Sequence, residues 1–201
     1  MAAKKDKSGA GSGAWIAIIT ILLAMATWAV ISPEYLLKSL TAEREFARSL
    51  GGHATDQWVY GKTAESSLEQ VRGMPASFRG TDGLPSALKG WARERIVATW
   101  IWATLVLYRA NMLLVYFFAL MPLFFVMMMD GFWVNKISTY RFSAQSPIRH
   151  RFGVILSTWT TIGTCIWVVL PAPIPSVVAP LAILTLGFAS WTWLANLQKR
   201  V

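Results

Sequence analysis

Apolar and polar residues alternate in long blocks along this chain rather than residue by residue. Four blocks carry almost no charge, and they cover residues 14–31, 96–129, 152–170 and 176–196. A helix of about 20 apolar residues spans the roughly 30 Å hydrocarbon core of a bilayer. Three of the blocks fit one such helix each, and a proline-rich turn at 171–175 separates the last two. The pattern predicts an all-α membrane protein with four transmembrane helices.

The block Ile96–Met129 is too long for one transmembrane helix and too short for two. As a single helix it would be about 51 Å long at 1.5 Å per residue, whereas two spans and a turn need more than ~40 residues. We therefore expect one span over Ala110–Met129, preceded by an apolar helix from about Trp91 that rises out of the membrane or lies on it. Arg109 carries the only charge of the block, and at this boundary its cation can snorkel toward water.

The first block has two interpretations. A lysine-containing tail at 1–13 precedes it, and Ala24-Met25-Ala26 near its end matches the small-residue pattern of a secretory cleavage site. We favour an uncleaved anchor over 14–31, because apolar residues continue through Ile31, beyond that site.

Residues 32–95 differ from the rest, since they hold nine Lys or Arg and eight Asp or Glu. Glu34–Leu50 predicts an amphipathic helix, with Pro33 in its first turn and Gly51 at its end, and a second helix is expected over about Thr63–Arg72. The apolar side of the first helix contains Leu36, Leu37, Leu40, Phe46 and Leu50. The segment is too short to bury much core by itself, so we expect a small helical extracytoplasmic unit.

The distribution of Lys and Arg predicts the orientation in the membrane. Positive charges gather in the tail 1–13, the loop 130–151 and the tail 197–201, while the turn 171–175 has none. With four spans, the three basic segments share one side, which is then the cytoplasm. We expect a multi-pass membrane protein with both termini cytoplasmic and residues 32–95 on the outside.

Composition agrees with this class and narrows the chemistry. Hydrophobic residues make up 55% of the chain and charged residues 14%, against roughly a quarter charged in a soluble domain. The single cysteine, Cys165, excludes an internal disulfide, and His53 and His150 lack neighbours that would complete a metal site. No phosphate loop, dinucleotide fingerprint or nucleophile motif occurs. We therefore expect no enzyme activity, no cofactor and no metal.

The loop 130–151 combines aromatic and basic residues. Trp133, Ile137 and Tyr140 recur at helical spacing and form a short apolar stripe beside Lys136 and Arg141. One interpretation is an anchor at the membrane interface, whose Lys and Arg side chains contact anionic lipids. The other is a docking surface for a cytoplasmic partner. Sequence-specific binding of nucleic acid is not expected from so few Lys and Arg side chains.

Two further features concern the end of the second apolar block and the packing of the third. Asp130-Gly131 is typical of a helix end, with Gly131 as a left-handed cap. Gly153, Ser157, Thr161 and Cys165 lie four residues apart and form a stripe of small residues. Such a stripe permits close helix approach, either to the fourth span or to another subunit of a homo-oligomer.

The run from Asn111 through "MPLFFVMMMDGFWVNKI…YRF…SPIRHRFG", followed by "VVLPAPIPSVVAPL", resembles an inner-membrane family of integrative conjugative elements and conjugative plasmids. In one plasmid group this family is called TraJ, which is unrelated to the F-plasmid activator of that name. The resemblance covers about residues 90–185 and rests on Pro122, Asp130-Gly131, Ser146, His150 and the proline-rich turn. The chain departs from the arginine-dense loop of many members, since it has Asn135-Lys136 there.

The resemblance implies a non-enzymatic accessory of conjugative DNA transfer, which would assist the coupling ATPase or other parts of a type IV secretion system. The residues expected to contact that partner are Asp130, Trp133, Lys136, Tyr140, Arg141, Ser146, Arg149, His150 and Arg151. A subunit of a small-molecule transporter or channel is the alternative. Against it, the apolar blocks carry almost no ionisable residues and no repeat is seen, whereas substrate paths usually need them.

Overall fold

The computed structural model describes residues 22, 25–71, 77–78, 81, 83, 85–141 and 146–197. Within these ranges the regular structure is α-helical, as predicted. The main elements are α2 (Pro33–Val71), α4 (Ser86–Tyr140), α5 (Pro147–Val169) and α6 (Val178–Ala195).

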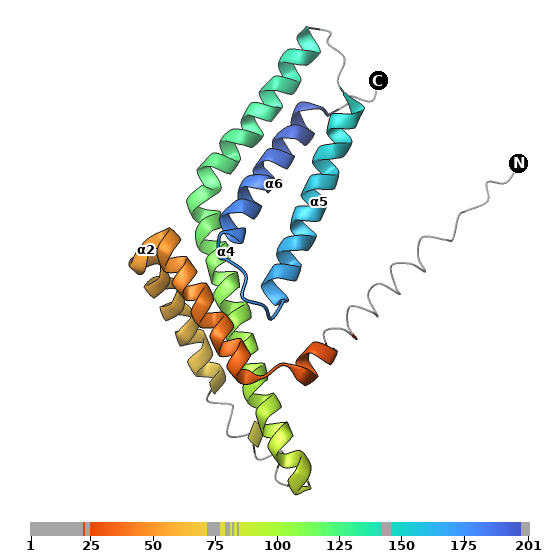
Figure 1. Cartoon of the computed structure of the whole chain (residues 1–201). Helices are drawn as coiled ribbons and strands as arrows, with labels where there is room; N and C mark the ends of the chain where they lie inside the picture. The colour runs from red at the N-terminus through yellow and green to blue at the C-terminus, as the bar shows by residue number, and fades with distance from the viewer. Residues whose placement is uncertain are drawn as a thin grey trace, which may run out of the picture.

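Three of these helices form a bundle in which α6 lies between α4 and α5 (Figure 1). Small residues on α6 are buried and let its neighbours approach, namely Ala179, Ala182, Gly187, Ala189 and Ala195. By length and composition, three described helices could cross a membrane, over Leu88–Tyr140, Pro147–Val169 and Val178–Ala195. The chain is therefore a helical protein with membrane-spanning character.

The predicted first span, 14–31, lies mostly outside the described residues. A helical segment at 25–30 is the described end of that block. The four-span arrangement therefore stays a prediction, as do the tails 1–13 and 197–201, of which only Leu197 is described.

The helix α4 is continuous over 55 residues, which corrects the predicted helix end at Asp130-Gly131. The expected apolar helix and second span form one rod, which includes Pro122 and extends ten residues beyond Asp130. Gly131 is buried and does not take a positive φ. A Cβ at Gly131 would lie 2.8 Å from the carbonyl oxygen of Trp191 on α6. The glycine therefore serves helix–helix contact rather than helix termination.

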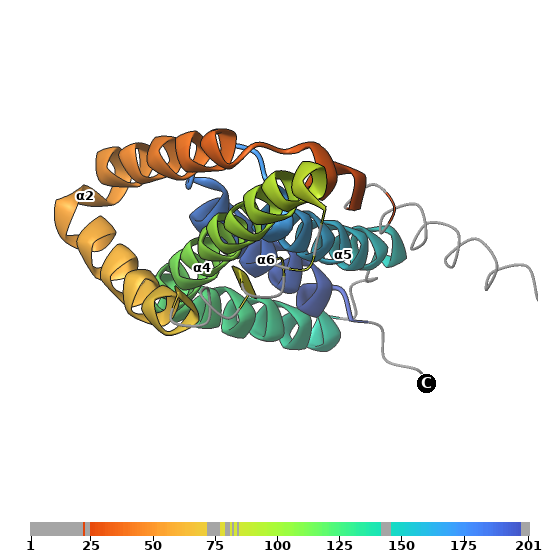
Figure 2. The same cartoon turned by 90° about the horizontal axis from the view of Figure 1, so that it is seen from below.

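The helix α2 folds into two arms that pack against α4 (Figure 2). Gly52 separates the arms with φ 76° and ψ 168°, a conformation that only glycine adopts readily. The predicted end of the first helix near Gly51 is thus confirmed. The second arm follows directly after Gly52, so its predicted start at Thr63 was too late.

The buried face of the first arm also differs from the predicted one. Leu36 and Leu40 are buried as expected, whereas the three other predicted apolar residues, Leu37, Phe46 and Leu50, are exposed. Glu43 takes a buried place on the face instead. The segment 32–95 therefore contributes a charged residue to the interior.

The helix α5 begins five residues before its predicted start at Phe152, because Ser146 caps it and Pro147 occupies its first turn. The Ser146 hydroxyl accepts a hydrogen bond from the Arg149 backbone N–H at 3.4 Å. Serine at the N-cap followed by proline is a strong helix start. Much of the predicted loop 130–151 is thus helical, divided between α4 and α5.

Candidate functional site

The basic end of the bundle is the site that the sequence indicates. There α4 extends beyond the end of α6 (Figure 1). The Asn135 side-chain amide donates to the carbonyls of Ala195 at 3.4 Å and Leu197 at 3.0 Å. These bonds satisfy carbonyls at the end of α6, which otherwise lack helical partners. The last turns of α4 after Asn135 therefore project past α6.

The last turns of α4, from Trp133 onward, display the predicted apolar stripe. Trp133 is 53% exposed, Ile137 49% and Tyr140 81%. The Lys136 ammonium lies 4.9 Å from the ring centre of Phe132 and 5.4 Å from that of Trp133. A cation at such distances is attracted by the ring faces. The result is an exposed surface that is aromatic and positively charged.

Three arginines continue this surface onto the start of α5. Arg141 is the C-cap of α4, and Arg149 and Arg151 lie in the first turns of α5. All three are exposed. We call the exposed set Trp133, Lys136, Tyr140, Arg141, Arg149 and Arg151 the basic end. It offers cations and aromatic faces to an anionic surface or partner.

The other three predicted contact residues hold the bundle together. Asp130 accepts a hydrogen bond from Trp191 Nε1 at 2.7 Å, and Ser146 caps α5. The His150 ring lies 6.4 Å from that of Trp193. Its Nδ1 is buried and has no hydrogen-bond partner among the described residues. Asp130 is exposed, and Ser146 and His150 are half-buried, so these side chains make contacts within the chain beside the basic end.

The small-residue stripe on α5 divides in a similar way. A Cβ at Gly153 would lie 2.8 Å from the backbone nitrogen of Trp193 on α6, so Gly153 marks a close helix contact. Ser157 is half-buried, while Thr161 and Cys165 are exposed. Within the chain, the close contact with α6 therefore involves the first part of the stripe.

A buried ion pair that the sequence analysis missed lies at the opposite end of α5. Arg109 of α4 and Glu43 of α2 are each at most 2% exposed. Arg109 Nε donates to Glu43 Oε2 at 3.0 Å, and Arg109 Nη2 donates to Glu43 Oε1. This two-pronged geometry is the strongest form of an arginine–carboxylate contact. The expectation that Arg109 snorkels at a boundary was wrong.

The Arg109 guanidinium also binds the end of α5 and the proline-rich turn. Its Nη atoms donate to the carbonyls of Trp167, Leu170 and Ala172. Glu43 in turn accepts a hydrogen bond from the Ile174 backbone N–H at 3.3 Å. We call this group the Arg109 cluster. It joins α2, α4 and the α5–α6 turn, and it satisfies carbonyls that a helix end leaves free.

A second charged group lies between the two arms of α2. The Asp56 side chain is fully buried and accepts hydrogen bonds from Arg48 Nε at 2.8 Å and Arg44 Nη2 at 3.3 Å. Tyr108 of α4 donates its hydroxyl to Asp56 at 3.3 Å. Burial raises the pKa of Asp56, but the hydrogen bonds and charges of both arginines outweigh it, so the pKa lies below its usual value. The carboxylate stays ionised and holds the arms together.

The Arg109 cluster and the Asp56 group both stabilise the fold, because the carboxylate of each binds arginine side chains of the same chain. Among the described residues, no group of three His, Cys, Asp or Glu side chains could hold a metal ion. The basic end gathers exposed aromatic and basic residues of α4 and α5, whereas exposed Lys38 and Lys62 lie apart from it on α2. The fold and this site define a helical membrane protein with an aromatic and cationic surface at one end of its bundle.

The comparison with protein families identifies the group to which the chain belongs. Residues 51–198 match the family model described as DtrJ-like, IncC plasmid conjugative DNA transfer protein. The chain is a member of this DtrJ-like family, and the resemblance to proteins of conjugative elements is confirmed. The match begins in α2, well before residue 90 where the resemblance began. No curated protein and no solved structure matches the chain.

Proposed function

We propose that the chain is a non-enzymatic accessory of conjugative DNA transfer in the bacterial inner membrane, where it assists the coupling ATPase or the secretion channel. The observation that carries this proposal is the basic end, an exposed aromatic and cationic surface at one end of the helix bundle in a chain from a conjugation family. A transporter role is less well supported, because the buried charges Arg109 and Glu43 bind each other instead of lining a path.

The orientation that we propose puts the basic end in the cytoplasm and α2 in the periplasm. Exposed Lys136, Arg141, Arg149 and Arg151 support it, because short cytoplasmic segments are enriched in Lys and Arg. With 14–31 as a first span, both termini are cytoplasmic.

Thiol labelling tests this orientation. Single cysteines replace Ser66 on α2 or Ser143 between α4 and α5, in a Cys165→Ala background. In intact cells with a permeabilised outer membrane, an impermeant maleimide is expected to label Ser66→Cys and spare Ser143→Cys until the inner membrane is opened. The opposite pattern would place the basic end outside the cytoplasm and exclude docking there.

Co-purification in mild detergent tests the partner. The double reversal of Lys136→Glu and Arg141→Glu is expected to reduce recovery of the coupling ATPase at least tenfold, because like charges across an interface repel by several kcal/mol. A single neutralisation should have a smaller effect, since one exposed charge pair contributes about 1 kcal/mol or less. Lys38→Glu is the control, because Lys38 is exposed on α2, away from the basic end. Unchanged recovery with the double reversal would leave the lipid-anchor interpretation.

A further inference from the structure

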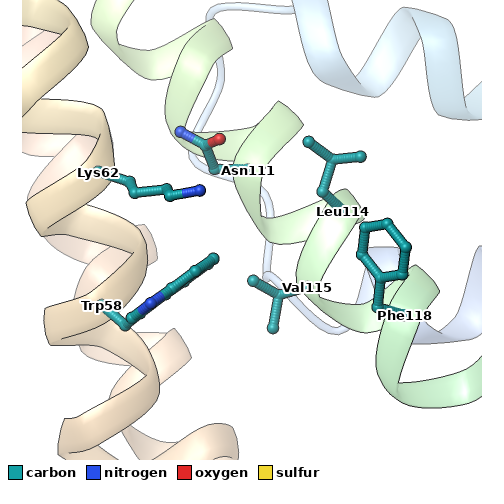
Figure 3. Close-up of a pocket in the computed structure, with 6 residues that line it drawn as sticks. All are labelled: Trp58, Lys62, Asn111, Leu114, Val115 and Phe118. Carbon is teal, nitrogen blue, oxygen red and sulfur yellow. The ribbon is translucent and has the colours of Figure 1, made fainter.

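A groove between α2 and α4 opens on the surface of the protein (Figure 3). Its volume is about 340 Å³, and it is lined by Trp58, Lys62, Asn111, Leu114, Val115 and Phe118. The first two residues come from the second arm of α2 and the others from α4. The groove is separate from the basic end and from both charged groups described above.

One end of the groove is polar and lies near the expected membrane surface. Arg109, two residues before Asn111, contacts the carbonyls at the end of α5, so this part of α4 is level with the end of a membrane-spanning helix. Lys62 is exposed, extends from α2 toward α4 (Figure 3), and its ammonium lies 4.9 Å from the Trp58 ring centre. The Asn111 amide nitrogen donates to Thr63 at 3.0 Å, and such a nitrogen carries a second hydrogen that can donate to a phosphate oxygen.

The other end of the groove is apolar and follows α4 into its membrane-spanning part. Leu114 and Phe118 come one and two turns after Asn111, and they are 53% and 65% exposed. Val115 forms the floor beside the packed core. Trp58, an amphipathic ring typical of membrane interfaces, lies between the polar and the apolar ends. The lining therefore changes from cationic to apolar in the direction that leads into the bilayer.

We propose that this groove binds one anionic phospholipid. The phosphate lies at Lys62 and Asn111, and an acyl chain lies along Leu114 and Phe118. The charge of the groove selects the headgroup, since its lining contains one cation, Lys62, and no carboxylate. A zwitterionic headgroup would bring its own ammonium toward Lys62, so an anionic lipid of the phosphatidylglycerol class is favoured. The apolar lining continues the surface that α4 presents to lipid, which argues for a lipid rather than a soluble anion.

Site-specific photocrosslinking tests the proposal on the full chain in nanodiscs made of equal parts phosphatidylglycerol and phosphatidylethanolamine. Phe118 is replaced by the photoreactive p-benzoylphenylalanine, and crosslinked lipid is identified by mass spectrometry. Phe125 carries the probe in the control, because it is 51% exposed on the same helix outside the groove. We expect phosphatidylglycerol to be enriched about fivefold at position 118, the factor that one lysine contributes near an anionic headgroup, and not at position 125.

Two lysine variants connect the enrichment to the groove. Lys62→Gln is expected to abolish the preference at position 118, while Lys38→Gln on the other arm of α2 should preserve it. Both lysines are exposed, so each substitution removes one surface charge and leaves the buried core unchanged. Equal lipid ratios at positions 118 and 125, an unchanged ratio with Lys62→Gln, or crosslinking to a second copy of the chain in place of lipid would each overturn the proposal.

Discussion

Replacing Arg109 by leucine is expected to release α2 from the bundle and to remove most of the folded protein from the membrane. The substitution leaves the Glu43 carboxylate buried without its cation, together with the carbonyls of Trp167, Leu170 and Ala172. Removing one partner of a buried ion pair costs about 3–5 kcal/mol. That is a large fraction of the 5–15 kcal/mol by which folded proteins are usually stable.

Thermal unfolding in mild detergent and membrane abundance measure this effect. Glu43→Gln should destabilise less than Arg109→Leu, because the guanidinium keeps its carbonyl partners and an amide oxygen can still accept a hydrogen bond. Arg149→Leu is the control, since Arg149 is exposed at the basic end. A midpoint that is the same for Arg109→Leu and Arg149→Leu would show that the Arg109 cluster does not hold the fold.

Leucine at Gly131 or Gly153 is expected to separate α6 from its neighbours. A Cβ at Gly131 would lie 2.8 Å from the Trp191 carbonyl oxygen, and one at Gly153 would lie 2.8 Å from the Trp193 nitrogen. Both are backbone atoms, so only a shift of the helices could make room. Overpacking typically costs 1–3 kcal/mol, and a full leucine side chain at a glycine contact lies at or above the upper end of that range.

Gly163 provides the matched control for this overpacking. It lies on α5 like Gly153, but a Cβ there would meet nothing within 4 Å. Gly163→Leu should therefore leave the unfolding midpoint and the membrane abundance near those of the unsubstituted protein. An equal loss at all three glycines would show that close packing against α6 is not the cause, because leucine favours a helix more than glycine does.

The comparison of sequence and structure is most instructive at Glu43 and Arg109. Apolar periodicity predicted a helix over the first arm of α2, and that helix exists. Glu43 lies seven residues after Leu36 and four before Ala47, two buried residues, so its place in the buried stripe was visible in the spacing. A single charge in an apolar block usually has a partner. The partner could not be deduced, because Glu43 is 66 residues away in the chain.

The helix end predicted at Gly131 was wrong because the role of this glycine also depends on a residue far away in the chain. Asp-Gly ends many helices because glycine tolerates a left-handed cap, but glycine also fits where two helices touch. Only the position of α6 decides between these roles, and position in space is not a local property. The exposed aromatic and basic residues of the same segment were predictable, since amphipathic spacing depends on neighbours along the chain alone.

The central claim is that the basic end serves conjugative DNA transfer, and a mating assay tests it most directly. Donor cells would carry the chain with Lys136→Glu and Arg141→Glu in place of the unsubstituted protein, and transfer frequency would be measured together with membrane abundance. We predict that transfer falls at least tenfold while abundance stays unchanged, and that Lys38→Glu transfers normally. Normal transfer from the doubly reversed donor at equal abundance would contradict a role of the basic end in DNA transfer.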